Sequence, residues 1–256
     1  MSAAHGSDSV RQRVSEEEWR ARVDLAACYR LIAMHGWDDL IFTHISMRVP
    51  GPEHHFLINP YGQLFEEITA SSLVKVDLDG VVVLETPYPV NPAGFVIHSA
   101  VHTAREDACC VLHLHTPHGQ AVSAQSHGLL PITQTAMALT DDVAYHDYEG
   151  IATDLEERER LVADLGAKGS MILRNHGTLT VGRDVPEAYL RMYFLERACE
   201  AQVMALGGGV PINEPPAGTP EKTAAIARQA FDMIAHKLAW PALLRRLDRV
   251  DPTYKD

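Results

Sequence analysis

Three histidines offer the clearest chemistry in this sequence of 256 residues. His113 and His115 flank Leu114 at the end of the apolar run CCVLHLH. Alternate side chains of a β-strand face the same side, about 6.5–7 Å apart at the backbone, so the two imidazoles can reach one ion. His176 follows the run MILR, where Asn175-His176-Gly177 predicts a tight turn with a left-handed backbone at the glycine. Three histidines with an open coordination position are typical of catalytic zinc and also suit Fe2+ or Mn2+.

Each histidine also has a structural interpretation. An isolated H-x-H is more often one buried and one solvated side chain, and His176 could be an ordinary turn residue. His98 and His102 have the spacing of an H-E-x-x-H peptidase, but Ser99 occupies the position of the general-base glutamate. We therefore reject peptidase chemistry and expect His98 to pack near the site from a helix.

Composition excludes several classes of function. Thirty-four acidic against 22 basic residues give a net charge of −12, and no basic stripe offers a surface for nucleic acid. No stretch approaches the roughly 18 apolar residues of a membrane span, and the N-terminus has no signal-peptide core. The cysteines lie inside apolar patterns and are expected to be reduced, so we expect a cytoplasmic protein without nucleic-acid or membrane partners.

The order of the expected elements predicts an α/β domain. A helix should run from Ser15 to Gly36, and short apolar runs broken by turn signals predict a strand meander over 38–84. Helices and strands alternate afterwards, which favours a central, largely antiparallel sheet flanked by helices. We expect a disordered tail over 1–14, one domain over 15–210, and a linker with a final helix over 211–256 that packs on the same domain or on a neighbouring subunit.

Several motifs in order resemble the class II aldolase/adducin family from about residue 16 to 206. They are THISMRVPG, NPYG, ITASSLVKVDLDG, NPAGFVIHSAVHTAR, VLHLHTPHGQAVSA, VAYHDYEGIA and MILRNHGTLTVG. The chain looks closer to the adducin head than to the sugar-phosphate aldolases. The resemblance implies a three-layer α/β/α sandwich around a mainly antiparallel sheet, and a homotetramer with its site at a subunit interface. It also implies one divalent ion, usually zinc, on His113, His115 and His176.

Two departures from the family pattern alter the expected chemistry. Sugar-phosphate aldolases of the family carry Ser-Ser-Glu where this chain has Pro92-Ala93-Gly94, so the usual acid/base glutamate is absent at Gly94. Their phosphate-binding Gly-Asn is replaced by Thr43-His44. The substrate is therefore expected to be a small molecule without a phosphate. The residues expected to contact it are Thr43, His44, Arg48, His55 and His118.

A replacement acid/base is expected in the segment YHDYEG. We predict His146 and Tyr148 as catalytic residues, since an unperturbed imidazole has a pKa near 6.5 and can move protons at neutral pH. The same segment could also be a polar loop at a subunit boundary. Other groups that could serve are His44, His55, Tyr145, Asp147 and Glu149.

Three functions are compatible with these residues. The first is a metal-dependent lyase that acts on a hydroxy-carbonyl or keto-acid substrate through a metal-stabilised enolate, with Arg48 or Arg174 available for a carboxylate. The second is a non-haem Fe(II) oxygenase that carries out oxidative decarboxylation of an aryl keto acid on the same three histidines. The third is a non-catalytic binding module like the adducin head. The final helix is expected to cover a neighbouring subunit's site, with Tyr254 as a possible contributor.

Overall fold

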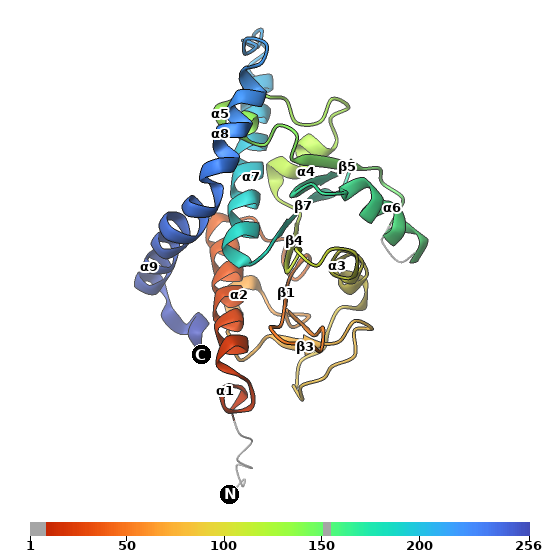
Figure 1. The fold of residues 1–256 in the computed structure, drawn as a ribbon, viewed down its shortest axis with the longest axis vertical. Helices are drawn as coiled ribbons and strands as arrows, with labels where there is room; N and C mark the ends of the chain where they lie inside the picture. Colours follow the sequence, from red (N-terminus) through yellow and green to blue (C-terminus); the bar gives the residue numbers. More distant parts are fainter. Residues whose placement is uncertain (1–8, 151–154) are drawn as a thin grey trace, which may run out of the picture.

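The computed structural model of the chain describes residues 9–150 and 155–256, and Figure 1 shows its fold. Within these residues a seven-stranded sheet has the order β3-β2-β1-β4-β7-β6-β5. Every neighbouring pair is antiparallel except β5 and β6, which are parallel. The strands are β1 (His44–Arg48), β2 (Phe56–Ile58), β3 (Val74–Val76), β4 (Cys110–Leu114), β5 (Val143–His146), β6 (Ser170–Leu173) and β7 (Gly177–Gly182).

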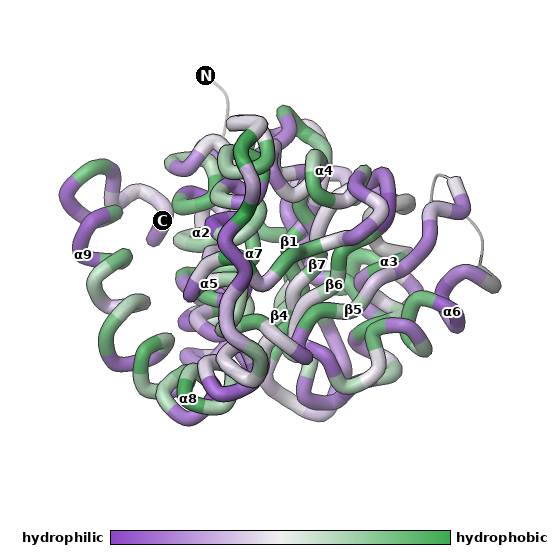
Figure 2. Tube along the Cα trace, turned by 90° about the horizontal axis from the view of Figure 1, so that it is seen from above, coloured by the Kyte–Doolittle hydropathy of each residue, from purple (hydrophilic) through white to green (hydrophobic). Residues whose placement is uncertain are grey.

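Helices cover both faces of the sheet, which gives the expected three-layer α/β/α sandwich (Figure 1). One face packs against α2 (Glu16–His35) and α7 (Val185–Gly207), and the other against α3 (Pro92–Ala104) and α6 (Leu155–Leu165). Seen from above, the central strands are largely hydrophobic between these two layers (Figure 2). The remaining helical elements are α1 (Val10–Arg13), α4 (Pro117–Ser123), α5 (Gln134–Ala138), α8 (Thr219–Met233) and α9 (Trp240–Val250), with short turns η1 (Phe65–Glu67), η2 (Ile234–Ala239) and η3 (Pro252–Lys255).

Strand alternation divides the core between the two faces. In β4, Leu112 and Leu114 belong to the core cluster under α2 and α7. Val111 belongs to the cluster under α3 and α6, and His113, two residues on, faces the same way. The helix α2 begins as predicted, because the Ser15 side chain accepts from the backbone N–H of Glu18. It ends at Gly36, whose backbone is left-handed (φ 66°).

The N-terminal tail differs from the expectation where it is described. Val10–Arg13 form the one-turn helix α1, where the backbone N–H of Ser9 donates to Gln12 Oε1 at 3.1 Å and the N–H of Gln12 donates to the Ser9 carbonyl. Arg11 pairs with Glu16 and lies over the Trp19 ring, 5.2 Å from its centroid, which ties the turn to α2. Residues 1–8 lie outside the described residues. Thr153, which with Glu156 has the sequence pattern of a helix capping box, also lies outside them.

The C-terminal segment packs on its own chain. The helices α8 and α9 are continuous through the π-helical turn η2 (Figure 1). The Trp240 indole N–H donates to Asp24 at 3.0 Å, and Tyr254 is fully buried with its hydroxyl on Asp248 at 2.8 Å. Tyr254 is thus a core residue of this subunit rather than a contributor to a neighbour's site. No helix among the described residues is long and apolar enough to cross a membrane.

Candidate metal centre

His113, His115 and His176 meet at one end of the sheet. Their ligand atoms all lie within 4.8 Å of one another, and their ring centroids are 4.8–5.1 Å apart. His113 is in β4 and His115 directly follows that strand, while His176 lies in the turn between β6 and β7. Because β4 pairs with β7, the strand end and the turn come together, as the sequence predicted.

Two of the three rings are fixed by hydrogen bonds to the nitrogen that faces away from the cluster. His113 Nδ1 lies 3.1 Å from the carbonyl oxygen of Thr178, and His115 Nδ1 lies 2.9 Å from a carboxylate oxygen of Asp39. Both partners only accept, so Nδ1 carries the proton in each ring. Each Nε2 is then left with a lone pair for an ion.

The rings of His113 and His176 are held in the neutral state that binds metal. The pKa of His113 lies well below 6.5, mainly because the ring is buried and secondly because His176 and His115 are close to it. The pKa of His176 is lowered to about 4, mainly by burial and secondly by the nearby His115 ring. Neutral imidazoles release no proton when they bind an ion near pH 7.

The donor atoms of the three histidines are suited to a divalent ion. His115 Nε2 is buried and has no hydrogen-bond partner among the described residues. Such an atom is destabilising unless something occupies the space in front of it. Three lone-pair nitrogens with two oriented rings match a three-ligand zinc site with one position open, so His113, His115 and His176 could hold the ion.

Thr43 and His44 lie beside the cluster. His44 in β1 pairs in register with His113 in β4. The pKa of His44 is lowered to about 4, mainly by burial and secondly by the nearby His115 ring. Asn91 Nδ2 is 3.2 Å from His44 Nε2. Thr43 has φ 68°, a left-handed backbone that is strained for a β-branched residue. Its buried hydroxyl has no partner among the described residues.

A chain of buried hydrogen bonds ends at His98 on the same side of the sheet. His98 Nδ1 is 2.6 Å from Ser46 Oγ, which is 2.7 Å from His102 Nε2. His102 Nδ1 is 2.7 Å from the carbonyl oxygen of Ala108. His98 is fully buried, as expected for a helix histidine near the site, and its Nε2 makes no hydrogen bond to the described residues.

His146 and Tyr148 line a narrow cleft together with His176. The Tyr148 and His176 ring centroids are 6.1 Å apart, and Tyr148 is 53% exposed. His146 Nδ1 is 2.7 Å from Asp164, so that carboxylate holds the proton on Nδ1. The buried Nε2 of His146 lies 3.7 Å from a carboxylate oxygen of Glu157 and has no hydrogen-bond partner among the described residues. The structure therefore brings both predicted catalytic residues next to one of the three clustered histidines.

Other residues expected at the substrate do not reach the cluster in this chain. Arg48 lies at the far end of β1, where it donates to the carbonyl of His102 and stacks on Phe56. The backbone carbonyl of His55 accepts from Val49 at that same end. Arg48 is the last residue of β1 and His44 is the first, so the two side chains lie at opposite ends of the strand.

Two further candidates, His118 and Arg174, make hydrogen bonds within the fold instead of facing the cluster. His118 Nδ1 lies 2.9 Å from the buried carboxylate of Glu196, which also accepts from the backbone N–H of Gly119 at the start of α4. Arg174 donates to the carbonyls of Gln125 and Ser126 and lies over the Tyr145 ring. Arg174 thus anchors the segment after α4 rather than presenting a free guanidinium.

Gly94, where the family pattern places the acid/base glutamate, lies in the first turn of α3.

The turn that presents His176 differs from the sequence prediction in one respect. Asn175, not Gly177, has the left-handed backbone, with φ 55°. Gly177 is required for another reason: a Cβ there would lie 2.5 Å from the carbonyl oxygen of Leu114 and 3.1 Å from the His115 ring. The close approach of β7 to β4 therefore sets the position of His176.

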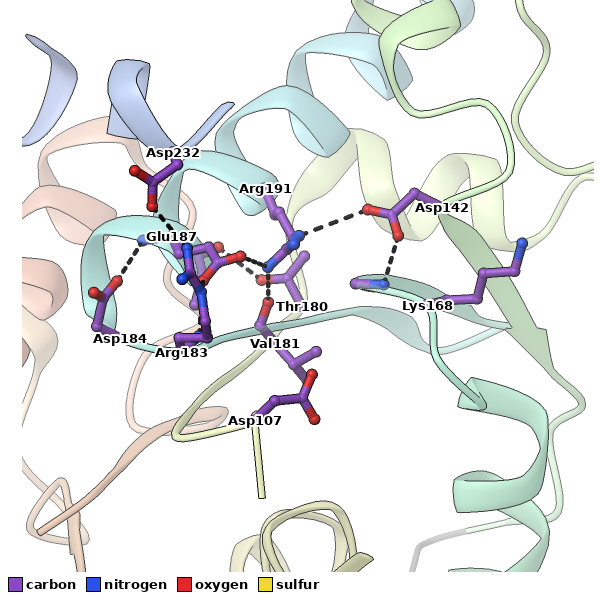
Figure 3. A network of polar contacts seen from close by, with 12 residues as sticks. Asp107, Asp142, Lys168, Thr180, Val181, Arg183, Asp184, Glu187, Arg191 and Asp232 are labelled. Atoms are coloured by element: carbon purple, nitrogen blue, oxygen red, sulfur yellow. Dashed lines mark hydrogen bonds and ion pairs between the residues drawn. The ribbon is translucent and has the colours of Figure 1, made fainter. Parts of the chain in front are cut away.

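A polar network lies at the other end of β7. Glu187 contacts Arg183 and Arg191 at 2.9 Å each, and Arg191 also donates to the carbonyl of Val181 (Figure 3). These side chains line a cavity of about 340 Å3 between α5, α7 and α8. The arginines are balanced by carboxylates, so we interpret this network as a structural joint between helices and sheet.

Comparison with known proteins identifies the class of the chain. The profile of the family described as Class II Aldolase and Adducin N-terminal domain matches residues 23–203. The chain belongs to this family, as the motifs indicated.

Individual relatives carry two kinds of name. A protein of Caulobacter vibrioides named "Putative aldolase class 2 protein" is 62% identical over 250 residues, which are 97% of this chain and 96% of that protein. Alpha-adducin of Mus musculus is 50% identical over 212 residues, which are 81% of this chain but only 28% of that protein. The structure of L-fuculose 1-phosphate aldolase from Glaciozyma antarctica PI12 has a TM-score of 0.78 and 30% identity, and covers 94% of this chain and 93% of its own.

Sequence reasoning missed the residues that orient the histidines. Asp39 lies outside the quoted motifs, 76 positions before His115. Ser46, Asn91 and Thr178 lie inside the motifs THISMRVPG, NPAGFVIHSAVHTAR and MILRNHGTLTVG, but no role was assigned to them there. The pairing of β4 with β1 and with β7 brings Ser46 and Thr178 to the cluster. Ser46 had a detectable signal, because it lies two residues after His44 and must face the same side of a strand.

Proposed function

We propose that the protein is a divalent-metal-dependent lyase of the class II aldolase type. Its substrate would be a small, non-phosphorylated hydroxy-carbonyl or keto-acid compound, and its ion would be Zn2+, with Fe2+ or Mn2+ as alternatives. The observation that carries the proposal is the convergence of His113, His115 and His176 with their ligand atoms within 4.8 Å. The kinship with an L-fuculose 1-phosphate aldolase over most of both chains supports it.

Residues of the chain would divide the work as follows. His113, His115 and His176 would hold the ion through Nε2, with Thr178 and Asp39 keeping two of the rings in register. When bound, the ion supplies Lewis-acid polarisation of a substrate carbonyl. The non-phosphorylated substrate is favoured because Arg48 and Arg174 both donate to backbone carbonyls instead of facing the cluster.

His146 and Tyr148 are proposed to move protons. Asp164 accepts from His146 Nδ1, and His146 would move a proton through Nε2, which lies 3.7 Å from Glu157 in the cleft shared with His176. Tyr148 lies on the exposed side of that cleft and can return a proton to a leaving group. This pair would replace the glutamate that the family pattern places at Gly94.

The active assembly is proposed to be a homotetramer with the site at an interface. Leu40, next to Asp39, is 66% exposed, and Phe42 and Tyr148 are 46% and 53% exposed. Large apolar side chains exposed around a polar site are typical of a surface that a second subunit covers. Light scattering on the purified protein tests this, and a monomer at micromolar concentration would contradict it.

Metal analysis combined with a substrate screen tests the function. The wild type should bind one equivalent of zinc and release an aldehyde or carbon dioxide from some member of a panel of hydroxy-ketones and keto acids. His113→Ala and His176→Ala should lose both properties, whereas His127→Ala, at an exposed histidine outside the site, should keep both.

Two results would replace the proposal by another function. Iron in anaerobic preparations with oxygen uptake on aryl keto acids would indicate the oxygenase. If the wild type converts no substrate and the cluster variants only lose stability, the protein would be a binding module like the relative named alpha-adducin.

A further inference from the structure

Two unpartnered nitrogen atoms lie beside the histidine cluster, and their protonation can be worked out from their neighbours. They are Nδ1 of His44 and Nε2 of His98, both buried and both without a hydrogen-bond partner among the described residues. The two rings are perpendicular, with centroids 6.0 Å apart.

The proton on His98 is fixed by the hydrogen-bond chain behind it. The carbonyl of Ala108 can only accept, so His102 Nδ1 donates and its Nε2 has a lone pair in the neutral ring. Burial lowers the pKa of His102 to about 3, so the ring is neutral. Ser46 therefore donates its single hydroxyl proton to His102, and its oxygen can only accept from His98 Nδ1. His98 Nε2 is left as a hydrogen-bond acceptor.

The proton on His44 follows from Asn91. The Asn91 side-chain amide nitrogen donates to His44 Nε2 at 3.2 Å, so the neutral His44 ring carries its proton on Nδ1. His44 Nδ1 is therefore an unused donor, and His98 Nε2 is an unused acceptor. Leaving either atom unpaired in a buried site is costly, which favours a ligand that satisfies both.

A hydroxyl group is the simple partner that both accepts and donates a hydrogen bond. A carboxylate would satisfy His44 but would face the lone pair of His98. Resting on the proposed function of the neighbouring cluster, we propose that His44 and His98 form a hydroxyl-binding pair that accepts one hydroxyl group of the substrate. His44 donates to the hydroxyl oxygen and His98 accepts its proton. This selects α-hydroxy carbonyl compounds over simple keto acids.

Nitrogen NMR of metal-free protein labelled with 15N-histidine tests the tautomers. We expect His44, His98 and His102 to carry the proton on Nδ1. Ser46→Ala should leave His98 as a mixture of tautomers, because its donor contact is lost. Ser170→Ala should change none of the three rings, since Ser170 is also a fully buried strand serine and has no partner among the described residues. A proton on Nε2 of His98 in the wild type would overturn the proposal.

Binding to zinc-loaded protein tests the selectivity. Pyruvate and 3-hydroxypyruvate differ by one hydroxyl group, and calorimetry should show the hydroxy compound binding about tenfold more tightly to the wild type. Ser46→Ala should reduce this ratio to about two, and Ser170→Ala should preserve it. Equal binding of the two compounds would overturn the hydroxyl-binding pair and leave the lyase standing. Binding of neither compound would overturn the hydroxyl-binding pair, whereas the lyase is decided separately by metal analysis and the substrate panel.

Discussion

Asp39 accepts a hydrogen bond from Nδ1 of His115 at 2.9 Å, across 76 positions of sequence. The contact joins the loop before β1 to the end of β4, and the carboxylate is 42% exposed while the imidazole is 21% exposed. A carboxylate behind a ligating histidine fixes the tautomer and increases the basicity of the nitrogen that faces the ion. The ligand geometry of the cluster therefore depends on a residue that does not itself face the ion.

Removing the charge of Asp39 should weaken metal binding. We expect Asp39→Asn to lower zinc affinity by roughly 10–100-fold, because an amide orients and polarises the His115 ring less well. Competition with a chromogenic chelator measures the affinity directly. Asp38→Asn, which changes the neighbouring carboxylate, is the matched control and should leave the affinity unchanged; equal losses in both variants would assign the effect to net charge rather than to the contact.

Gly177 should tolerate no side chain. In Gly177→Ala the added Cβ would lie 2.5 Å from the Leu114 carbonyl oxygen and 3.1 Å from the His115 ring, so β7 and β4 must separate. We expect a loss of roughly 1–3 kcal/mol in unfolding free energy, typical of overpacking, together with weaker zinc binding.

Gly36 provides the control for this substitution. It has φ 66° and nothing within 4 Å of an added Cβ, so Gly36→Ala introduces backbone strain without a clash. We expect about 1–2 kcal/mol of destabilisation in urea unfolding and unchanged zinc affinity. The interpretation of Gly177 fails if Gly177→Ala also destabilises the fold without affecting zinc.

Local patterns were sufficient to predict part of the site. Strand alternation predicted that His113 and His115 share a face, and turn residues predicted the hairpin that carries His176. Both signals depend on a few adjacent residues, and the pairing of β4 with β7 then brings the two segments together. The layered fold followed in the same way, from the order of helical and strand periods.

Long-range relationships could not be predicted in this way. Ser46 and His98 are 52 positions apart, and nothing local indicates that they form a hydrogen bond. Arg48 was expected at the substrate because it is close to His44 in sequence, but four strand residues span more than 10 Å and the two lie at opposite ends of β1. The sequence predicted a left-handed backbone at Gly177, and this was wrong. A glycine is required there because β7 approaches β4 too closely for a Cβ atom.

Replacing Thr43 should stabilise the fold and weaken ligand binding. Its buried hydroxyl has no partner among the described residues, so Thr43→Val, which keeps the side-chain shape, should raise the unfolding free energy by about 1 kcal/mol. Ligand affinity at the neighbouring cluster should fall. Thr180→Val is the control with the opposite sign, since the Thr180 hydroxyl donates to the Ala188 carbonyl at 3.0 Å. Destabilisation of equal size in both variants would mean that the Thr43 hydroxyl is already satisfied.

Glu187 should make the fold sensitive to acid. Burial alone would raise the pKa of this carboxyl group, but Arg191 and Arg183 outweigh it, and the pKa lies below its usual value of 4.5. A group whose pKa is lower in the folded protein stabilises the fold above its unfolded pKa, and this contribution disappears as the pH falls through the folded value. The wild type should therefore lose stability below about pH 4.5.

Glu187→Gln isolates this contribution. At pH 7 the variant should be less stable by roughly 1–2 kcal/mol, because Arg191 loses a partly buried counter-charge, whereas Arg183 is 59% exposed and keeps Asp232 (Figure 3). The difference from wild type should shrink as the pH falls below 4.5, where the wild-type carboxylate also becomes neutral. Urea unfolding at pH 7, 5, 4 and 3 measures this convergence. Glu159→Gln, at an exposed position of α6, should match the wild type at every pH, and a Glu187→Gln deficit that persists undiminished at pH 3 would show that packing rather than charge is lost.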